Sequence, residues 1–157
     1  MRASLCAGAL VFVACSGGVS PGGDAGIDAG PQPKLSALPD CGTAPSDAGT
    51  ANDLYTNIVV PYGCASGGCH GGTPPNHFEI LDGPTFRTVM LEESDQVPGL
   101  PRVTPGNLHR SYVMYKLLDQ HKDAGYSGSG ERMPFGGPYL SDSEVCSVAN
   151  WITAGAP

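Results

Sequence analysis

The residues that point most directly to chemistry are Cys64, Cys69 and His70, within the segment CASGGCH at residues 64–70. Two cysteines with a histidine directly after the second form the attachment motif of a c-type haem, in which two residues usually separate the cysteines. Four residues separate them here. In such a site the cysteines supply two thioether anchors and the histidine supplies an axial nitrogen to the iron. The segment therefore predicts either a stretched haem-attachment motif or a small disulfide loop followed by a histidine.

A haem iron held by His70 needs a second axial ligand from elsewhere in the chain, and Met133 is the best candidate. It precedes a proline in a Gly-rich stretch just before the C-terminal helix pattern. Met90 and Met114 instead stand in helical patterns, where methionine usually belongs to the core. Imidazole–thioether ligation raises the iron's potential and leaves no open coordination position, so the predicted chemistry is one-electron transfer and not enzymatic catalysis. Three histidines are alternative ligands: His77, His109 and His121.

Two other interpretations of the cysteine segment remain open. Cys64 and Cys69 could close a disulfide, which would make the chain a haem-free, disulfide-stapled surface lipoprotein that acts as a binding module. A zinc ion could instead take two sulfurs and two nitrogens from a set that includes His70 and His77. Hydrolase chemistry has no support, because the sequence contains neither a nucleophile-elbow motif nor a His-Glu metal helix.

The sequence around these residues predicts helices. Hydrophobic spacing predicts helices at residues 52–60, 85–93 and 108–120, and Pro61 ends the first of them just before Cys64. Gly67 and Gly68 can take the positive φ values that a longer loop needs. The fourth helix begins with a Ser141–Glu144 capping box. Its apolar face follows at helical spacing: Val145, Val148, Ala149 and Ile152. No stretch alternates as a strand does, so we predict a small all-α domain with long Gly/Pro-rich loops.

The N-terminal part of the chain predicts export. Residues 1–14 begin with Arg2 and continue as a short apolar stretch, which is typical of a signal peptide. They end at Ala14, and residues 12–15, FVAC, are similar to a bacterial lipobox, in which Cys15 becomes the lipidated N-terminus. The alternative is an ordinary secretory signal in which the cysteine is incidental. Residues 15–40 are rich in Gly, Pro and Asp and predict a flexible tether, which leaves residues 41–157 as the folded domain.

The chain carries a formal net charge of −7. This charge argues against a nucleic-acid partner, because phosphate neutralisation needs a basic face. It permits docking onto a basic protein. The predicted location is the periplasm or the outer membrane, with the membrane reached through the N-terminal lipid.

The chain resembles the small exported c-type cytochrome domains of myxobacteria and planctomycetes. The resemblance covers about residues 53–157 and rests on five segments in the family's order: LYTNI at 54–58, GCHGG at 68–72, VTPGN at 103–107, Met133-Pro134, and NWITAGA at 150–156.

The resemblance implies a class I cytochrome c-like helical domain with one covalently attached haem c. Cys64 and Cys69 would be the anchors, His70 the proximal ligand and Met133 the distal ligand. Cys41 and Cys146 are the remaining pair of cysteines, and the crossing of terminal helices in this family would bring them close enough for a structural disulfide. Its redox partners, which the sequence does not identify, would be separate proteins.

Overall fold

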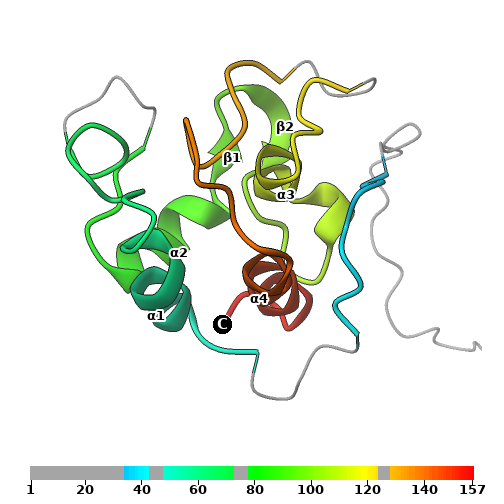
Figure 1. Cartoon of the computed structure of the whole chain (residues 1–157), viewed down its shortest axis with the longest axis horizontal. Helices are drawn as coiled ribbons and strands as arrows, with labels where there is room; N and C mark the ends of the chain where they lie inside the picture. Colours follow the sequence, from blue (N-terminus) through cyan, green and yellow to red (C-terminus); the bar gives the residue numbers. More distant parts are fainter. Residues whose placement is uncertain (1–33, 43–47, 73–77, 124–127) are drawn as a thin grey trace, which may run out of the picture. The chain divides into compact units, whose positions relative to one another are not determined.

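The computed structural model describes residues 34–42, 48–72, 78–123 and 128–157, all within one unit of the chain, Pro31–Pro157. The predicted signal peptide, Cys15, His77 and most of the predicted tether lie outside the described residues. Among the described residues, no helix is both long enough and apolar enough to cross a membrane. The elements follow in this order (Figure 1): helix α1 (Ala51–Leu54), π-helical turn η1 (Tyr55–Val59), helix α2 (Gly83–Leu91), strands β1 (Glu93–Ser94) and β2 (Val97–Pro101), 3-10 turn η2 (Leu108–Arg110), and helices α3 (Tyr112–Leu117) and α4 (Asp142–Thr153).

The prediction of an all-α, class I cytochrome c-like domain is wrong, because β1 and β2 form an antiparallel two-stranded sheet and make the fold mixed α/β. Glu93 pairs with Pro101 and Ser94 with Val97, with an irregular register between the two pairs. The sheet gives no alternating pattern because β1 has only two residues and β2 contains two prolines and Gly99. A side-chain hydrogen bond also joins the two strands, because the Glu93 carboxylate accepts the Gly99 N–H.

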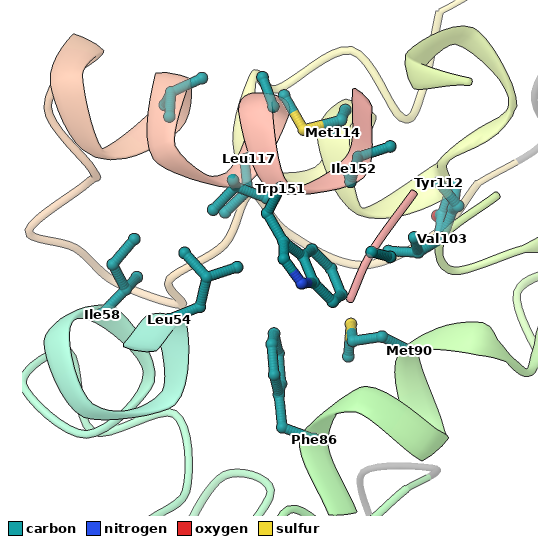
Figure 2. Packing of buried hydrophobic residues seen from close by; sticks show 14 of the residues in the cluster. Leu54, Ile58, Phe86, Met90, Val103, Tyr112, Met114, Leu117, Trp151 and Ile152 are labelled. Carbon is teal, nitrogen blue, oxygen red and sulfur yellow. The ribbon is translucent and has the colours of Figure 1, made fainter. Parts of the chain in front are cut away.

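Trp151 of α4 lies at the centre of the hydrophobic core (Figure 2). Its indole is fully buried and stacks on Phe86 of α2, with 5.7 Å between ring centroids. Leu54 of α1 and Met90 of α2 point toward the same ring. The indole N–H donates to the carbonyl of Pro157 at 3.0 Å. Helices α1, α2 and α4 therefore meet around one aromatic side chain.

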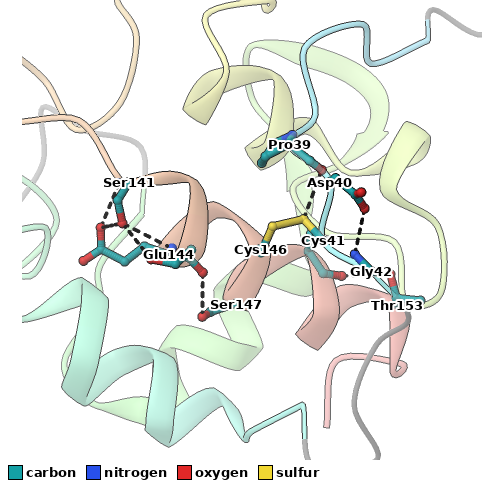
Figure 3. The surroundings of a disulfide bond; sticks show 11 residues. Pro39, Asp40, Cys41, Gly42, Ser141, Glu144, Cys146, Ser147 and Thr153 are labelled. Atoms are coloured by element: carbon teal, nitrogen blue, oxygen red, sulfur yellow. Dashed lines mark hydrogen bonds between the residues drawn. A yellow bond between two sulfur atoms is a disulfide. The ribbon is translucent and has the colours of Figure 1, made fainter.

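Helix α4 begins as the sequence predicts. The Ser141 hydroxyl accepts the Glu144 N–H, and the Glu144 carboxylate accepts the Ser141 N–H, which confirms the capping box. This cap lies at one end of α4, and further along the same helix Cys146 is bonded to Cys41 (Figure 3). The disulfide is the pair that the resemblance implies, and it fastens residues 34–42 to α4.

The helix predicted at residues 108–120 is interrupted at Ser111, which separates η2 from α3. Ser111 is extended and fully buried. Its hydroxyl donates to the Asn107 carbonyl at 2.8 Å and accepts the Thr104 N–H at 2.9 Å. A side chain that bonds to nearby backbone groups competes with the helical hydrogen bonds, so the helix restarts after this residue.

Replacement of both Cys41 and Cys146 by alanine tests the contribution of the disulfide. The cross-link joins residues 105 apart in sequence. Because a long closed loop restricts the unfolded chain, we expect the free energy of unfolding to fall by roughly 3–5 kcal/mol. Guanidinium unfolding of the two proteins measures the difference. A loss below about 1 kcal/mol would show that residues 34–42 are held by their other contacts alone.

Candidate haem-attachment site

Cys64, Cys69 and His70 lie on a turn that closes on itself directly after η1. The Cys64 N–H donates to the Val59 carbonyl at 2.9 Å, so the turn begins on the last residue of η1. At its other end, the His70 N–H donates to the Cys64 carbonyl at 2.8 Å. This second bond brings the backbones of the first cysteine and the histidine together. Both thiols and the imidazole therefore belong to one hydrogen-bonded turn.

Gly71 makes this closure possible. A Cβ atom at this residue would lie 1.8 Å from the carbonyl oxygen of Ala65, a distance that no side chain tolerates. The Gly71 N–H donates to the Ser66 carbonyl at 2.9 Å, so the chain leaving His70 passes directly against the start of the turn. The expectation of positive φ at Gly67 and Gly68 is wrong. Positive φ occurs instead at Gly63 (+66°), just before Cys64.

The two cysteines are thiols in unequal surroundings. Cys64 is half-buried against the core, whereas Cys69 is exposed. Burial raises the pKa of the Cys64 thiol, and the neighbouring Cys69 sulfur raises it further. Because the thiolate is the more nucleophilic form, the raised pKa makes Cys64 the less reactive thiol. Cys69 is the more accessible of the two residues.

The imidazole of His70 is oriented by Phe78. The two rings are stacked, with centroids 4.1 Å apart and planes 11° from parallel. The His70 Nδ1 lies 3.3 Å from the Phe78 carbonyl oxygen. A carbonyl can only accept a hydrogen bond, so Nδ1 carries the proton and the lone pair of the neutral ring is on Nε2. This is the tautomer that a metal-ligating histidine requires when it coordinates through Nε2.

Arg102 supports Phe78. Its guanidinium carbon lies 4.4 Å from the centroid of the phenyl ring. The side chain is buried and is neutralised by Asp95 at 2.9 Å and by Glu92 at 3.5 Å. It also donates to the Val89 carbonyl at 3.0 Å. The sheet and the end of α2 therefore fix the aromatic ring on which His70 lies.

A side-chain hydrogen bond joins the residues just before the turn to α4. The Tyr62 hydroxyl, two residues before Cys64, donates to the Glu144 carboxylate at 2.7 Å. Hydrogen bonds from Ser141 and Tyr62 lower the pKa of Glu144. The same carboxylate therefore caps α4 and holds the chain that leads into the cysteine turn.

Met133 lies on a different segment, residues 128–140. Its side chain is half-buried against the core, and its N–H donates to the Lys116 carbonyl at 3.0 Å.

Met90 and Met114 are buried core residues, as predicted. His109 accepts the Leu35 N–H through Nδ1, at 3.2 Å. The pairing of His70 with Met133 as axial ligands stays a prediction.

Among the described residues, no three His, Cys, Asp or Glu side chains are grouped so as to hold a metal ion. The zinc set includes His77, which lies outside them. No family model, no curated protein and no solved structure matches this chain.

The sequence identified the thiols and the imidazole but not the residues that position them. The available sequence signal for a close backbone contact was the pair of glycines, Gly71 and Gly72, directly after His70. No sequence pattern indicated Phe78 and Arg102. The contact of the Arg102 guanidinium with the Phe78 ring joins residues 24 apart in sequence, and only the fold brings them together.

Substitution of Gly71 by alanine tests whether the turn depends on its close backbone contact. The Cβ would force the Ala65 carbonyl away, so we expect the free energy of unfolding to fall by about 1–3 kcal/mol and the Cys64 thiol to react faster with a thiol reagent. Gly67→Ala is the matched control, because a Cβ there meets nothing within 4 Å. Equal effects of the two substitutions would contradict the closed turn.

Proposed function

We propose that this chain is an exported one-electron carrier with a single covalently attached c-type haem. The haem would be held by Cys64 and Cys69 and ligated by His70 and Met133. The observation that carries the proposal is the hydrogen bond from His70 Nδ1 to the Phe78 carbonyl within the closed cysteine turn. With Nδ1 engaged in that bond, Nε2 is the ring nitrogen that would ligate an iron ion, on the same turn as the two thiols.

The donor set suits this group. Cys64 and Cys69 would each hold the haem through a thioether, the product of S–H addition across a vinyl group, which needs no oxidant. The exposure of Cys69 favours this step, and the burial of Cys64 makes it the slower anchor. A bound c-type haem supplies a one-electron couple at its iron.

Exposed apolar side chains close in sequence to both predicted ligands further support the proposal. Among the described residues, Val60 is a large exposed hydrophobic side chain four positions before Cys64. Phe135, two positions after Met133, is 70% exposed, and Tyr139 on the same segment is about half exposed. Side chains of this kind supply the apolar lining that a cofactor site needs.

The proposed role is electron transfer and not catalysis. With His70 and Met133 as its ligands, a bound haem iron would have no coordination position left for a substrate. The proposed setting is the periplasm or the outer membrane, with a lipid on Cys15 and redox partner proteins that are separate from this chain.

Covalent haem attachment is the direct test. The full chain, exported by a host with haem-maturation machinery, is expected to show a Soret band and to stain for haem after denaturation. Intact mass spectrometry should give a mass increase of one haem. Because Cys69 is exposed and adjacent to the proximal ligand, Cys69→Ser should abolish attachment, while Cys64→Ser should reduce it.

A colourless product from such a host, with Cys64 and Cys69 joined in a disulfide, would overturn the proposed function in favour of the haem-free binding module. The Cys41→Ala, Cys146→Ala protein is the control for the general loss of cysteines, and it should keep its haem.

The distal ligand is tested separately. Met133→Ala should remove the weak red absorption of an iron–sulfur(Met) bond in the ferric protein while the haem stays attached. Met114→Leu is the control, because Met114 is buried in the core and should not affect this absorption. An unchanged spectrum in Met133→Ala would place the distal ligand elsewhere.

A further inference from the structure

Two buried polar side chains lie outside the cysteine turn and need an explanation. Lys116 of α3 is 7% exposed, and His121, shortly after α3, is fully buried. Lysine and histidine are costly to bury unless they are hydrogen-bonded. Burial lowers the pKa of Lys116, as expected for an ammonium removed from water. Each of these two buried side chains therefore needs a hydrogen-bond acceptor that the fold supplies.

Both side chains bind to the backbone that leads into Met133. The Lys116 ammonium donates to the Ser129 carbonyl at 3.0 Å. The Nε2 atom of His121 lies 3.0 Å from the Gly130 carbonyl, which can only accept, so the imidazole donates. Two consecutive carbonyl groups are therefore held by side chains that come from one short stretch of the chain, residues 116–121.

Two reciprocal bonds complete the attachment. The Met133 N–H donates to the Lys116 carbonyl at 3.0 Å, and the Arg132 guanidinium donates to the Leu117 carbonyl at 2.8 Å. Four hydrogen bonds thus connect residues 129–133 to residues 116–121. This segment forms neither helix nor strand, and Gly130 has a φ of +75°. Side-chain hydrogen bonds replace the backbone ladder that a regular element would provide.

We propose that Lys116 and His121 are positioning residues that fix the backbone before Met133 and so hold its thioether in place as the distal ligand. This inference rests on the proposed function. The geometry gives it a direct physical basis, because Lys116 binds the segment twice, through its ammonium and through its carbonyl. Loss of the ammonium would leave the Ser129 carbonyl without this buried donor and would loosen the residues that lead to Met133.

The test compares Lys116→Leu with Lys122→Leu in the full chain. Lys122 is the matched control, because it also reaches this segment, through an exposed 3.6 Å ion pair with Glu131. Exposed pairs of this kind contribute little. Leucine keeps apolar bulk at each position and adds no new iron ligand. His121→Leu is the second variant, and circular dichroism checks that each protein is folded.

The first measurement is the binding of added imidazole to the ferric protein in competition with Met133. We expect Lys116→Leu to bind imidazole about tenfold more tightly than the wild type, the factor that corresponds to the loss of one buried hydrogen bond. The red iron–sulfur absorption should weaken in parallel, while Lys122→Leu should stay within about twofold of the wild type. A purely structural role would lower stability without changing this competition.

The second measurement is the hydrogen exchange of the Met133 amide, which does not need the haem. Exchange should be about tenfold faster in Lys116→Leu, and His121→Leu should accelerate it in the same direction. If the wild type carries no haem, the proposed function fails, and the exchange of this amide alone decides whether the two residues hold the segment. Unchanged exchange and unchanged imidazole binding in folded Lys116→Leu would overturn the inference.

Discussion

The burial of the Trp151 indole is the constraint on which the rest of the structure depends. A buried indole N–H must find an acceptor, and this one reaches the Pro157 carbonyl, so the chain turns back directly after α4. The positive φ of Gly155 (+96°) allows that turn. The same carbonyl accepts the Ala51 N–H at 3.1 Å, at the first residue of α1. One aromatic side chain therefore fixes both the end of α4 and the start of the helix that leads to the cysteine turn.

The candidate site is built on irregular segments, and polar side chains hold each of them. The turn at residues 64–71 follows α1 and η1, and the Tyr62–Glu144 bond joins its approach to α4. The aromatic support of His70 depends on Arg102, whose charge is matched by two carboxylates. The segment before Met133 depends on Lys116 and His121. A hydrogen bond in a buried site is stronger than one in water, so a few of them can orient chain segments that no helix or sheet constrains.

Local signals predicted the regular parts of this fold and failed where distant residues decide the conformation. The α4 cap was predictable because its two residues lie within one helical turn. The first helix was predicted at residues 52–60, and in the structure Thr50 caps it. The β1–β2 sheet was missed because Arg102 and Glu93 stabilise strands that have no apolar alternation of their own. At the site, chemistry identified the thiols and the imidazole. The need for Gly71 arises only when the turn closes and its backbone meets Ala65.

The closed turn also explains how four residues fit between the cysteines. Ser66 accepts the N–H groups of both Cys69 and Gly71, at 2.9 Å each, so the additional residues form a turn of their own. The bond between the Cys64 carbonyl and the His70 N–H is made across that inner turn. The separation of the first cysteine from the histidine is therefore set by this hydrogen bond and not by the number of residues between the thiols. With this longer spacing Cys69 is exposed, while the backbones of Cys64 and His70 stay in contact.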